Sequence, residues 1–190
     1  MAELYPIFLK LENRPVLVVG GGNIACRKVE GLCQAGAAVR VIATRFSTEL
    51  QAMPGITREL RPWQPGDCKD AVLVIAATDD AAVNKAVRVE CEALGLPVNS
   101  VDDPPNCSFY LPAIVRRGDL RIAISTQGNV PMLASRLREK LDDVLPAGLA
   151  DLTAGAATLR ERLKATEPDT AKRNDALRQY VHAELQKLFP

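Results

Sequence analysis

Three consecutive glycines after an apolar run constrain the fold of this 190-residue chain more than any other feature. The run Pro15–Val19 has the composition of a buried strand, and the residues that follow Gly22 favour a helix. Gly20, Gly22 and Ala25 fit G-x-G-x-x-G/A, in which glycine allows a tight turn and a close approach of backbone to phosphate. Two interpretations remain open: a pyrophosphate site at the helix N-terminus, or a tight turn that binds nothing.

The residues after the turn supply the context that a dinucleotide-binding fold requires. A second strand is predicted at residues 39–43, so strand, helix and strand follow one another. Such folds often end this strand with an acid that binds the ribose, but no Asp or Glu occurs between Gly31 and Thr48. Thr44 and Arg45 occupy this position. Arg45 either accepts the 2′-phosphate of NADP or is a solvated loop residue, so the residues alone leave NAD and NADP open.

A third apolar run, at residues 71–77, is continuous, as expected for a parallel strand buried on both faces. Ligands of open α/β sheets bind beyond the carboxyl ends of the strands, so Thr78 and Asp79 are predicted to lie beside the glycine turn and contact cofactor. The alternative is that Asp79 or Asp80 only caps the next helix. A short strand at 96–101 completes a βαβαβ order, which predicts an α/β fold with a Rossmann-type parallel sheet.

The sequence pattern changes after residue 101. A proline-rich turn carries Asp102 and Asp103, and two further strands are predicted around a turn at 116–119, followed by amphipathic segments. The other expected elements are strands at 108–114 and 120–125 and helices at 81–94, 132–144, 149–164 and 170–188.

Charge and cysteine content exclude several classes of protein. The 24 basic and 23 acidic residues nearly cancel, which disfavours a strongly basic nucleic-acid-binding protein. The five cysteines are odd in number and lack C-x-x-C spacing, so neither a disulfide framework nor a metal cluster is expected. No membrane span or secretory leader is recognisable, so we expect a cytoplasmic protein with reduced thiols.

Few groups are available for acid–base catalysis. His182 is the one histidine, and its place in the last predicted helix favours a surface or packing role. Asp102 and Asp103 are better placed, because they follow a strand on the side expected to face the cofactor. Partial burial there would raise the pKa of either carboxyl toward the working range of a general base.

Six blocks of sequence together resemble the precorrin-2 dehydrogenase module of siroheme synthases. The blocks are residues 5–9, 18–28, 76–80, 99–102, 108–113 and 131–140. The resemblance implies an NAD-dependent oxidoreductase that converts precorrin-2 to sirohydrochlorin. In several members the module also inserts ferrous iron, as a sirohydrochlorin ferrochelatase (a lyase). Asp102 matches the family's catalytic aspartate, and the same carboxylate can receive a proton during metal insertion.

The resemblance also carries residues for cofactor and substrate. The cofactor positions fall on Asn23, Ile24, Thr44 and Arg45. The tetrapyrrole bears many acetate and propionate groups, which call for cations and hydroxyls in the second half of the chain. Ser125, Thr126 and Arg136 are the positions taken as substrate-binding, with Arg116, Arg117 and Arg121 as further candidates. Gln127 departs from the more usual Ser-Ser-Gly-Gly or Ser-Thr-Gly-Gly pattern, which leaves the local geometry and any role of Thr126 open.

The family forms homodimers through the segment after the nucleotide domain, which corresponds to residues 111–144. Leu133, Leu137 and Leu141 form an apolar stripe there that serves either the core or the dimer contact. The expected domains are an NAD-binding Rossmann domain at 1–112, a small α+β dimerisation segment at 113–146 and a C-terminal helical domain at 147–190. The chain ends at Pro190, so we expect no methyltransferase, and another protein would supply the precorrin-2.

Two alternatives remain. A regulatory domain that senses NAD or NADH would use the same glycine turn without catalysis, but it would not need Asp102 in a proline-rich turn. A different small dehydrogenase would show a Tyr/Lys or His/Asp dyad, and Tyr110 and Lys140 are too loosely placed to form one.

Overall fold

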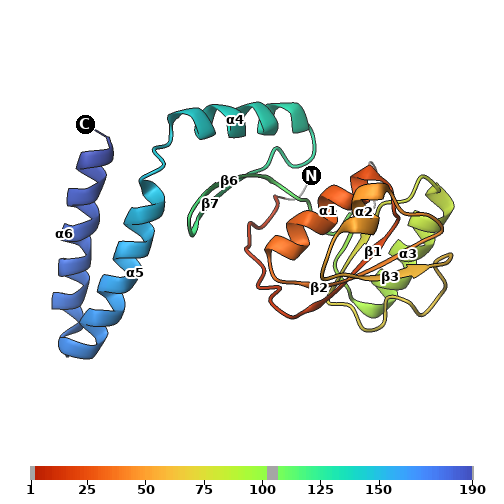
Figure 1. Ribbon diagram of the computed structural model, residues 1–190, viewed down its shortest axis with the longest axis horizontal. Helices are drawn as coiled ribbons and strands as arrows, with labels where there is room; N and C mark the ends of the chain where they lie inside the picture. Colours follow the sequence, from red (N-terminus) through yellow and green to blue (C-terminus); the bar gives the residue numbers. More distant parts are fainter. Residues whose placement is uncertain (1–2, 102–106, 190) are drawn as a thin grey trace. The chain divides into compact units, whose positions relative to one another are not determined.

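The computed structural model describes residues 3–101 and 107–189, which divide into a first unit, residues 1–110, and a second unit, residues 111–190. In chain order the first unit contains β1 (Pro15–Val19), α1 (Asn23–Gln34), β2 (Ala38–Ala43), α2 (Thr48–Ala52), β3 (Thr57–Leu60), β4 (Leu73–Ala76), α3 (Ala81–Leu94) and β5 (Val98–Ser100) (Figure 1). The second unit contains β6 (Ala113–Arg117), β7 (Leu120–Ile124), α4 (Pro131–Val144), α5 (Leu149–Thr166) and α6 (Thr170–Leu188).

The five strands of the first unit form one parallel sheet in the order β3-β2-β1-β4-β5. Val18 of β1 stands in register with Val41 of β2 on one side and with Ile75 of β4 on the other. The chain builds β2 and β3 on one side of β1, then crosses over to build β4 and β5 on the other. The carboxyl ends of β1 and β4 therefore form the point where strand order reverses, where such sheets bind ligands. The predicted α/β Rossmann-type sheet is confirmed.

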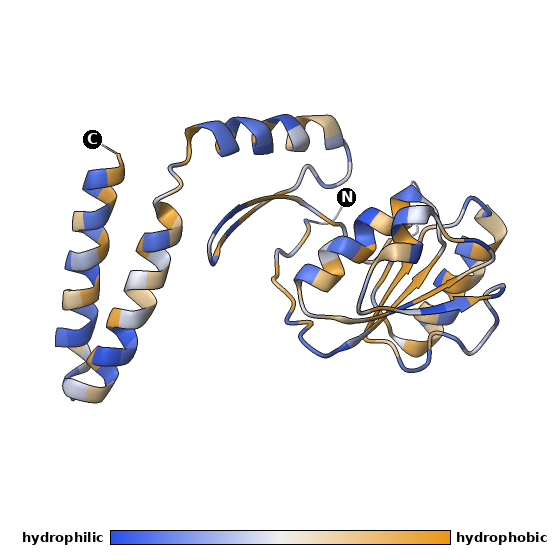
Figure 2. Ribbon diagram, viewed as in Figure 1, coloured by the Kyte–Doolittle hydropathy of each residue, from blue (hydrophilic) through white to orange (hydrophobic). Residues whose placement is uncertain are grey.

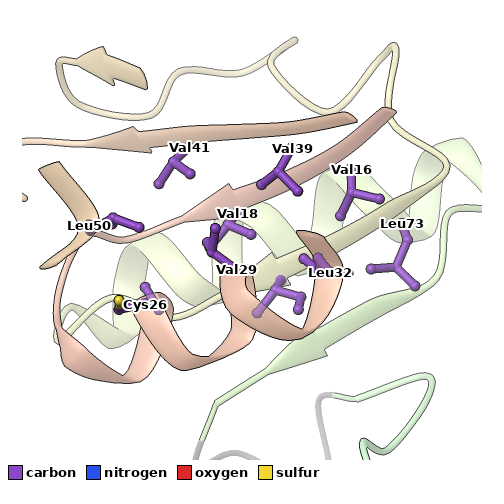
Figure 3. Close-up of a cluster of buried hydrophobic side chains, with 11 residues drawn as sticks. Val16, Val18, Cys26, Val29, Leu32, Val39, Val41, Leu50 and Leu73 are labelled. Atoms are coloured by element: carbon purple, nitrogen blue, oxygen red, sulfur yellow. The ribbon is translucent and has the colours of Figure 1, made fainter. Parts of the chain in front are cut away.

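Both faces of the sheet are buried. Val16 and Val18 point to one face and Leu17 and Val19 to the other, because side chains alternate along a strand. The first face packs on the apolar side of α1 and on Leu50 of α2 (Figure 3). The opposite face packs on α3. The α1 side chains in this core recur at helical spacing, which is why this segment folds as a helix on the sheet; they are Ala25, Cys26, Val29 and Leu32.

The structure adds two elements that the sequence patterns did not predict, α2 and the edge strand β3. Neither has a long apolar run. α2 is only five residues long, and Ser47 caps it by accepting a hydrogen bond from the Leu50 N–H. β3 carries Arg58 and Glu59, which are bound to other polar groups, so its side chains do not alternate in hydrophobicity. Its place in the sheet comes from pairing with β2.

The strand predicted at 108–114 is wrong, because β6 begins only at Ala113. The segment before it is bound back to β5 instead. The Ser108 N–H donates to the Val98 carbonyl at 2.9 Å, and the Val98 N–H donates to the Ser108 hydroxyl at 2.7 Å. The turn after β6 is shorter than the predicted turn at 116–119. Arg116 and Arg117 belong to β6, and only Gly118 and Asp119 connect it to β7.

The second unit consists of a β6–β7 hairpin and three helices. Ala134 of α4 is buried, and Arg117 of β6 reaches the end of α4, where it binds the Asp142 carboxylate at 3.0 Å and the Leu145 carbonyl. α5 and α6 pack on each other, and polar residues cover much of both (Figure 2). In the chain as far as the structure describes it, no helix is long and apolar enough to cross a membrane.

Candidate functional site: the glycine turn and its neighbours

The glycine turn is wedged between the ends of β2 and β4. Gly20 has φ +125°, and a Cβ there would lie 2.3 Å from the carbonyl oxygen of Ala77. A Cβ at Gly21 would lie 1.9 Å from the carbonyl oxygen of Arg45. Only glycine fits at these two positions, whether or not a ligand binds.

Gly22 is different. Nothing lies within 4 Å of a Cβ built there, and its backbone is extended, with φ −83°. Gly22 is the N-cap of α1, where no side chain caps the helix and the first turn has no acid. α2, α3 and α6 are capped by Ser47, Asp80 and Asp169, whereas α4 and α5, like α1, have no side-chain cap. Gly22, Asn23 and Ile24 are exposed, and no side chain caps the first N–H groups of α1, which fits an anionic diphosphate.

The end of β2 places Thr44 and Arg45 on the surface beside the turn. The Ser47 N–H donates to the Gly21 carbonyl at 2.7 Å, which holds this loop against the glycines. The Arg45 guanidinium lies 3.3 Å from the Asp79 carboxylate, which follows β4, and both side chains are more than 85% exposed. The structure therefore brings four predicted cofactor positions, Gly20, Gly22, Arg45 and Asp79, to one edge of the sheet.

Asp80, and not Asp79, caps α3. Its carboxylate accepts hydrogen bonds from the N–H groups of Ala82 and Val83 at 2.8 and 3.2 Å. Asp79 is therefore not needed to begin the helix. Thr78 is half-buried and precedes Asp79 after the end of β4; contact of either residue with the cofactor stays a prediction.

Asn84 is a residue of this site that the sequence reasoning missed. The residue is 7% exposed, and its amide nitrogen donates to the Thr78 carbonyl at 3.0 Å. Its amide oxygen accepts from the Thr78 N–H at 3.2 Å and from the Thr78 hydroxyl at 2.7 Å. The available signal was an amide on the buried face of a helix, in line with Val87 and Cys91. Asn84 fixes the backbone from which Asp79 projects.

Asp102 and Asp103 lie outside the described residues, so the catalytic assignment of Asp102 stays a prediction. Cys107, the first residue described after Val101, has its sulfur 3.2 Å from the Ser100 nitrogen. Cys26 and Cys33 pack against the core, and burial raises the pKa of both thiols, which keeps them protonated at neutral pH. His182 is exposed on α6.

The predicted substrate-binding residues lie in the second unit, close together along the chain. The Ser125 hydroxyl accepts from the Gln127 N–H at 3.1 Å, and the Thr126 hydroxyl accepts from the Val130 N–H at 3.2 Å. Both O–H protons are left to donate to an acidic group. Arg136 is exposed on α4 and bound to Glu139 at 2.8 Å. Gln127 has φ +55°, a left-handed conformation that favours glycine, the residue that the resemblance leads us to expect there. Among described residues no cluster of three or more His, Cys, Asp or Glu could hold a metal.

A parallel sheet with a glycine turn and an uncapped helix N-terminus at its switch point defines a Rossmann-type dinucleotide-binding protein. The family model described as "Putative NAD(P)-binding" matches residues 7–113, and one described as "Sirohaem biosynthesis protein central" matches residues 117–143. The chain belongs to this NAD(P)-binding family. The expected nicotinamide cofactor is thereby supported.

Curated relatives extend the similarity. A protein named siroheme synthase from Methylobacillus flagellatus is 47% identical over 165 residues, which cover 85% of this chain and 35% of that protein. One of the same name from Ectopseudomonas mendocina is 42% identical over 172 residues, 90% of this chain and 37% of the relative. The chain thus spans little more than a third of these relatives.

Among solved structures, "SirC, precorrin-2 dehydrogenase" matches with a TM-score of 0.81 and 28% identity, covering 97% of this chain and 98% of that one. The resemblance found in the sequence is confirmed, and it extends over both units.

Proposed function

We propose that this chain is an NAD-dependent precorrin-2 dehydrogenase of siroheme biosynthesis, which oxidises precorrin-2 to sirohydrochlorin. The observation that carries the proposal is the structural similarity to a precorrin-2 dehydrogenase over nearly the whole of both chains. Similarity of the nucleotide-binding domain alone would support only the binding of a cofactor, since one fold hosts many functions. The match to the central siroheme model, at residues 117–143, adds support from the second unit.

In this proposal the cofactor supplies the hydride acceptor, and the residues of the first unit hold it. The glycine turn and the uncapped N–H groups of α1 bind the pyrophosphate. Thr44 and Arg45 lie on the adenosine side of the site, after β2. Thr78 and Asp79 border the site at the end of β4, with Asn84 fixing the turn beneath them.

Oxidation of the macrocycle by hydride removal also releases a proton. We assign Asp102 as the base that takes it, because the chain's one histidine lies on α6 and Asp102 matches the catalytic aspartate of the family. Ser125 and Thr126 donate hydroxyl protons to the acidic side chains of the tetrapyrrole, and Arg136 supplies positive charge. Ferrous iron is a second substrate in this proposal. Its insertion into sirohydrochlorin displaces two N–H protons, of which Asp102 receives one and solvent the other.

We also propose that the protein acts as a homodimer in the cytoplasm. Leu133 and Leu137 of α4 are 49% and 44% exposed, and Met132 beside them is 75% exposed. Apolar side chains grouped in this way on one helix are typical of a contact surface. A second copy of the chain is the partner that the family resemblance indicates.

The experiment is anaerobic absorbance spectroscopy of the purified protein with enzymatically generated precorrin-2 and NAD, before and after addition of ferrous ion. NADH formation with the spectrum of sirohydrochlorin is the expected result, and iron-accelerated loss of that spectrum would establish chelation. Iron insertion at the rate without protein would limit the function to dehydrogenation. Tight NAD binding without any spectral change would contradict the dehydrogenase and favour a regulatory nucleotide-binding domain.

Asp102→Asn is the matched variant for this assay. The substitution keeps the size of the side chain and removes the base, so it is expected to lower the dehydrogenation rate at least a hundredfold, about the contribution of general base catalysis. NAD affinity, measured by titration calorimetry, is expected to stay within about twofold of the unchanged protein. A variant with full turnover would refute the assignment of Asp102.

A further inference from the structure

The ion pair between Arg45 and Asp79 has no role in the steps above. The two residues follow different strands, β2 and β4, and their side chains meet at 3.3 Å across the edge of the sheet that carries the glycine turn. Arg45 occupies the position where an acid would bind the ribose of NAD or an arginine would bind the 2′-phosphate of NADP. An arginine already bound to a carboxylate is less available to bind a 2′-phosphate than an arginine without such a partner.

The backbone on both sides of the pair is held in place. The Arg45 carbonyl packs on Gly21, so closely that a Cβ there would lie 1.9 Å away. The Thr78 backbone next to Asp79 is bound on both its N–H and its carbonyl by the buried Asn84 amide. The pair thus joins two fixed points beside the turn, although both charged groups reach solvent.

We propose that the Arg45–Asp79 pair makes this site select NAD over NADP, an inference that rests on the proposed nucleotide binding. Asp79 engages the guanidinium that would otherwise bind the 2′-phosphate, and its own charge repels that group, which carries close to two negative charges at neutral pH. The ribose of NAD has a neutral hydroxyl there and does not meet this repulsion. Asp79 therefore provides, from β4, the acid that is missing after β2, and it acts by excluding the phosphorylated ribose.

The test is titration calorimetry of the full chain with NAD⁺ and NADP⁺ at fixed ionic strength. The unchanged protein is expected to bind NAD⁺ more tightly. Asp79→Asn is expected to strengthen NADP⁺ binding about tenfold, which is the effect of removing one exposed charge close to a phosphate. Adding Arg45→Ala to this variant is expected to remove the part of the gain that comes from the freed guanidinium, and the part that comes from the lost repulsion remains.

Asp80→Asn is the matched control, since it removes the same charge one residue away while asparagine still caps α3. It is expected to change NADP⁺ affinity less than twofold. Fluorescence of Trp63, the single tryptophan, checks that each variant is folded.

Three results would overturn the inference while nucleotide binding stands. These are unchanged NADP⁺ affinity in Asp79→Asn, an equal gain in Asp80→Asn, or a large loss of NAD⁺ affinity in Asp79→Asn, which would indicate direct contact with the ribose. Failure of the unchanged protein to bind either nucleotide would instead refute the proposed cofactor itself, and the inference with it.

Discussion

Gly20, Gly21 and Gly22 have different structural reasons to be glycine. Gly20 needs a positive φ and space next to Ala77, and Gly21 needs space next to Arg45. Gly22 needs neither, because its φ is ordinary and the space around it is open. Steric demands of the fold therefore explain the glycines at positions 20 and 21. They do not explain Gly22, where binding of a ligand close to the backbone would account for a glycine. Of the two interpretations of the glycine pattern, the position of Gly22 favours the phosphate site.

Replacement of Gly22 tests this site without disturbing the fold. Gly22→Asp puts a negative charge at the N-terminus of α1, where the diphosphate of the cofactor is expected to bind. NAD affinity in titration calorimetry is expected to fall at least tenfold, while the thermal unfolding temperature stays nearly unchanged.

Gly22→Asn is the control of equal size without the charge, and it is expected to weaken NAD binding clearly less than Gly22→Asp. Equal affinities of the aspartate variant and the unchanged protein would rule out a phosphate at this helix end.

At the scale of elements, the turn between β4 and α3 depends on two side chains with separate tasks. Asp80 begins the helix, and Asn84, one turn further on, binds the backbone and hydroxyl of Thr78. The sequence shows a cap in this place but not which of the two neighbouring aspartates is the cap. Which aspartate caps α3 depends on the path of the backbone between the end of β4 and the start of the helix.

Asn84→Ala is expected to lower the free energy of unfolding by about 2 kcal/mol, because the Thr78 N–H and carbonyl lose their partner in a half-buried place. NAD affinity is expected to fall as well, since the Thr78 backbone that borders the cofactor site is no longer fixed. Urea unfolding followed by Trp63 fluorescence measures the first effect. Lys85→Ala, at the next and exposed position of α3, is the control and is expected to change stability little.

A second group of charges joins β2, β3 and the loop before β4. The Arg61 guanidinium binds both carboxylate oxygens of Asp67 at 2.7 and 2.8 Å, and Arg40 binds Glu59 at 3.0 Å. Hydrogen bonds from Arg61 lower the pKa of Asp67 below its ordinary 3.8, and those from Arg40 lower the pKa of Glu59 below 4.5. This network fixes the edge strand that its own hydrophobic pattern does not predict.

These lowered pKa values predict the direction of an acid effect. A carboxyl with a depressed pKa in the folded state stabilises the fold fully above its ordinary pKa, and this contribution is lost as the pH falls through the folded value. Stability is therefore expected to decline below about pH 4. Asp67→Asn is expected to be about 1 kcal/mol less stable at pH 7 and to show a weaker decline on acidification.

Urea midpoints of both proteins, measured from pH 7 to pH 3, check this prediction. Parallel curves for Asp67→Asn and the unchanged protein would show that Asp67 is not the titrating group.

At the scale of the whole molecule, the two units are built differently. The first has apolar faces on both sides of its sheet, whereas α6 of the second has no buried residue. Leu133 and Leu137 keep much of their surface exposed within the described chain. Such a unit is stabilised by contact with another protein surface, and we expect a second copy to provide it.

Leu137→Glu places a charge in this surface and is expected to raise the dissociation constant of the dimer at least tenfold, because a carboxylate is costly to bury in an apolar contact. Light scattering coupled to size-exclusion chromatography measures the mass at micromolar concentration. Ser135→Glu introduces the same residue on an exposed part of α4 away from the stripe and is expected to leave the dimer intact. A monomeric unchanged protein would refute the proposed homodimer.

The sequence by itself determined the strand-glycine-helix unit, the buried strands and the bounds of α3 and α6, because hydrophobic period, glycine and capping residues act over short distances. It also carried the family resemblance. Only the tertiary structure revealed β3, the bonds of Ser108 to β5, the role of Asn84 and the meeting of Arg45 with Asp79. Each of these depends on contacts between residues distant in the chain or on a choice between neighbours. A local pattern carries no information about which segments the folded sheet brings together.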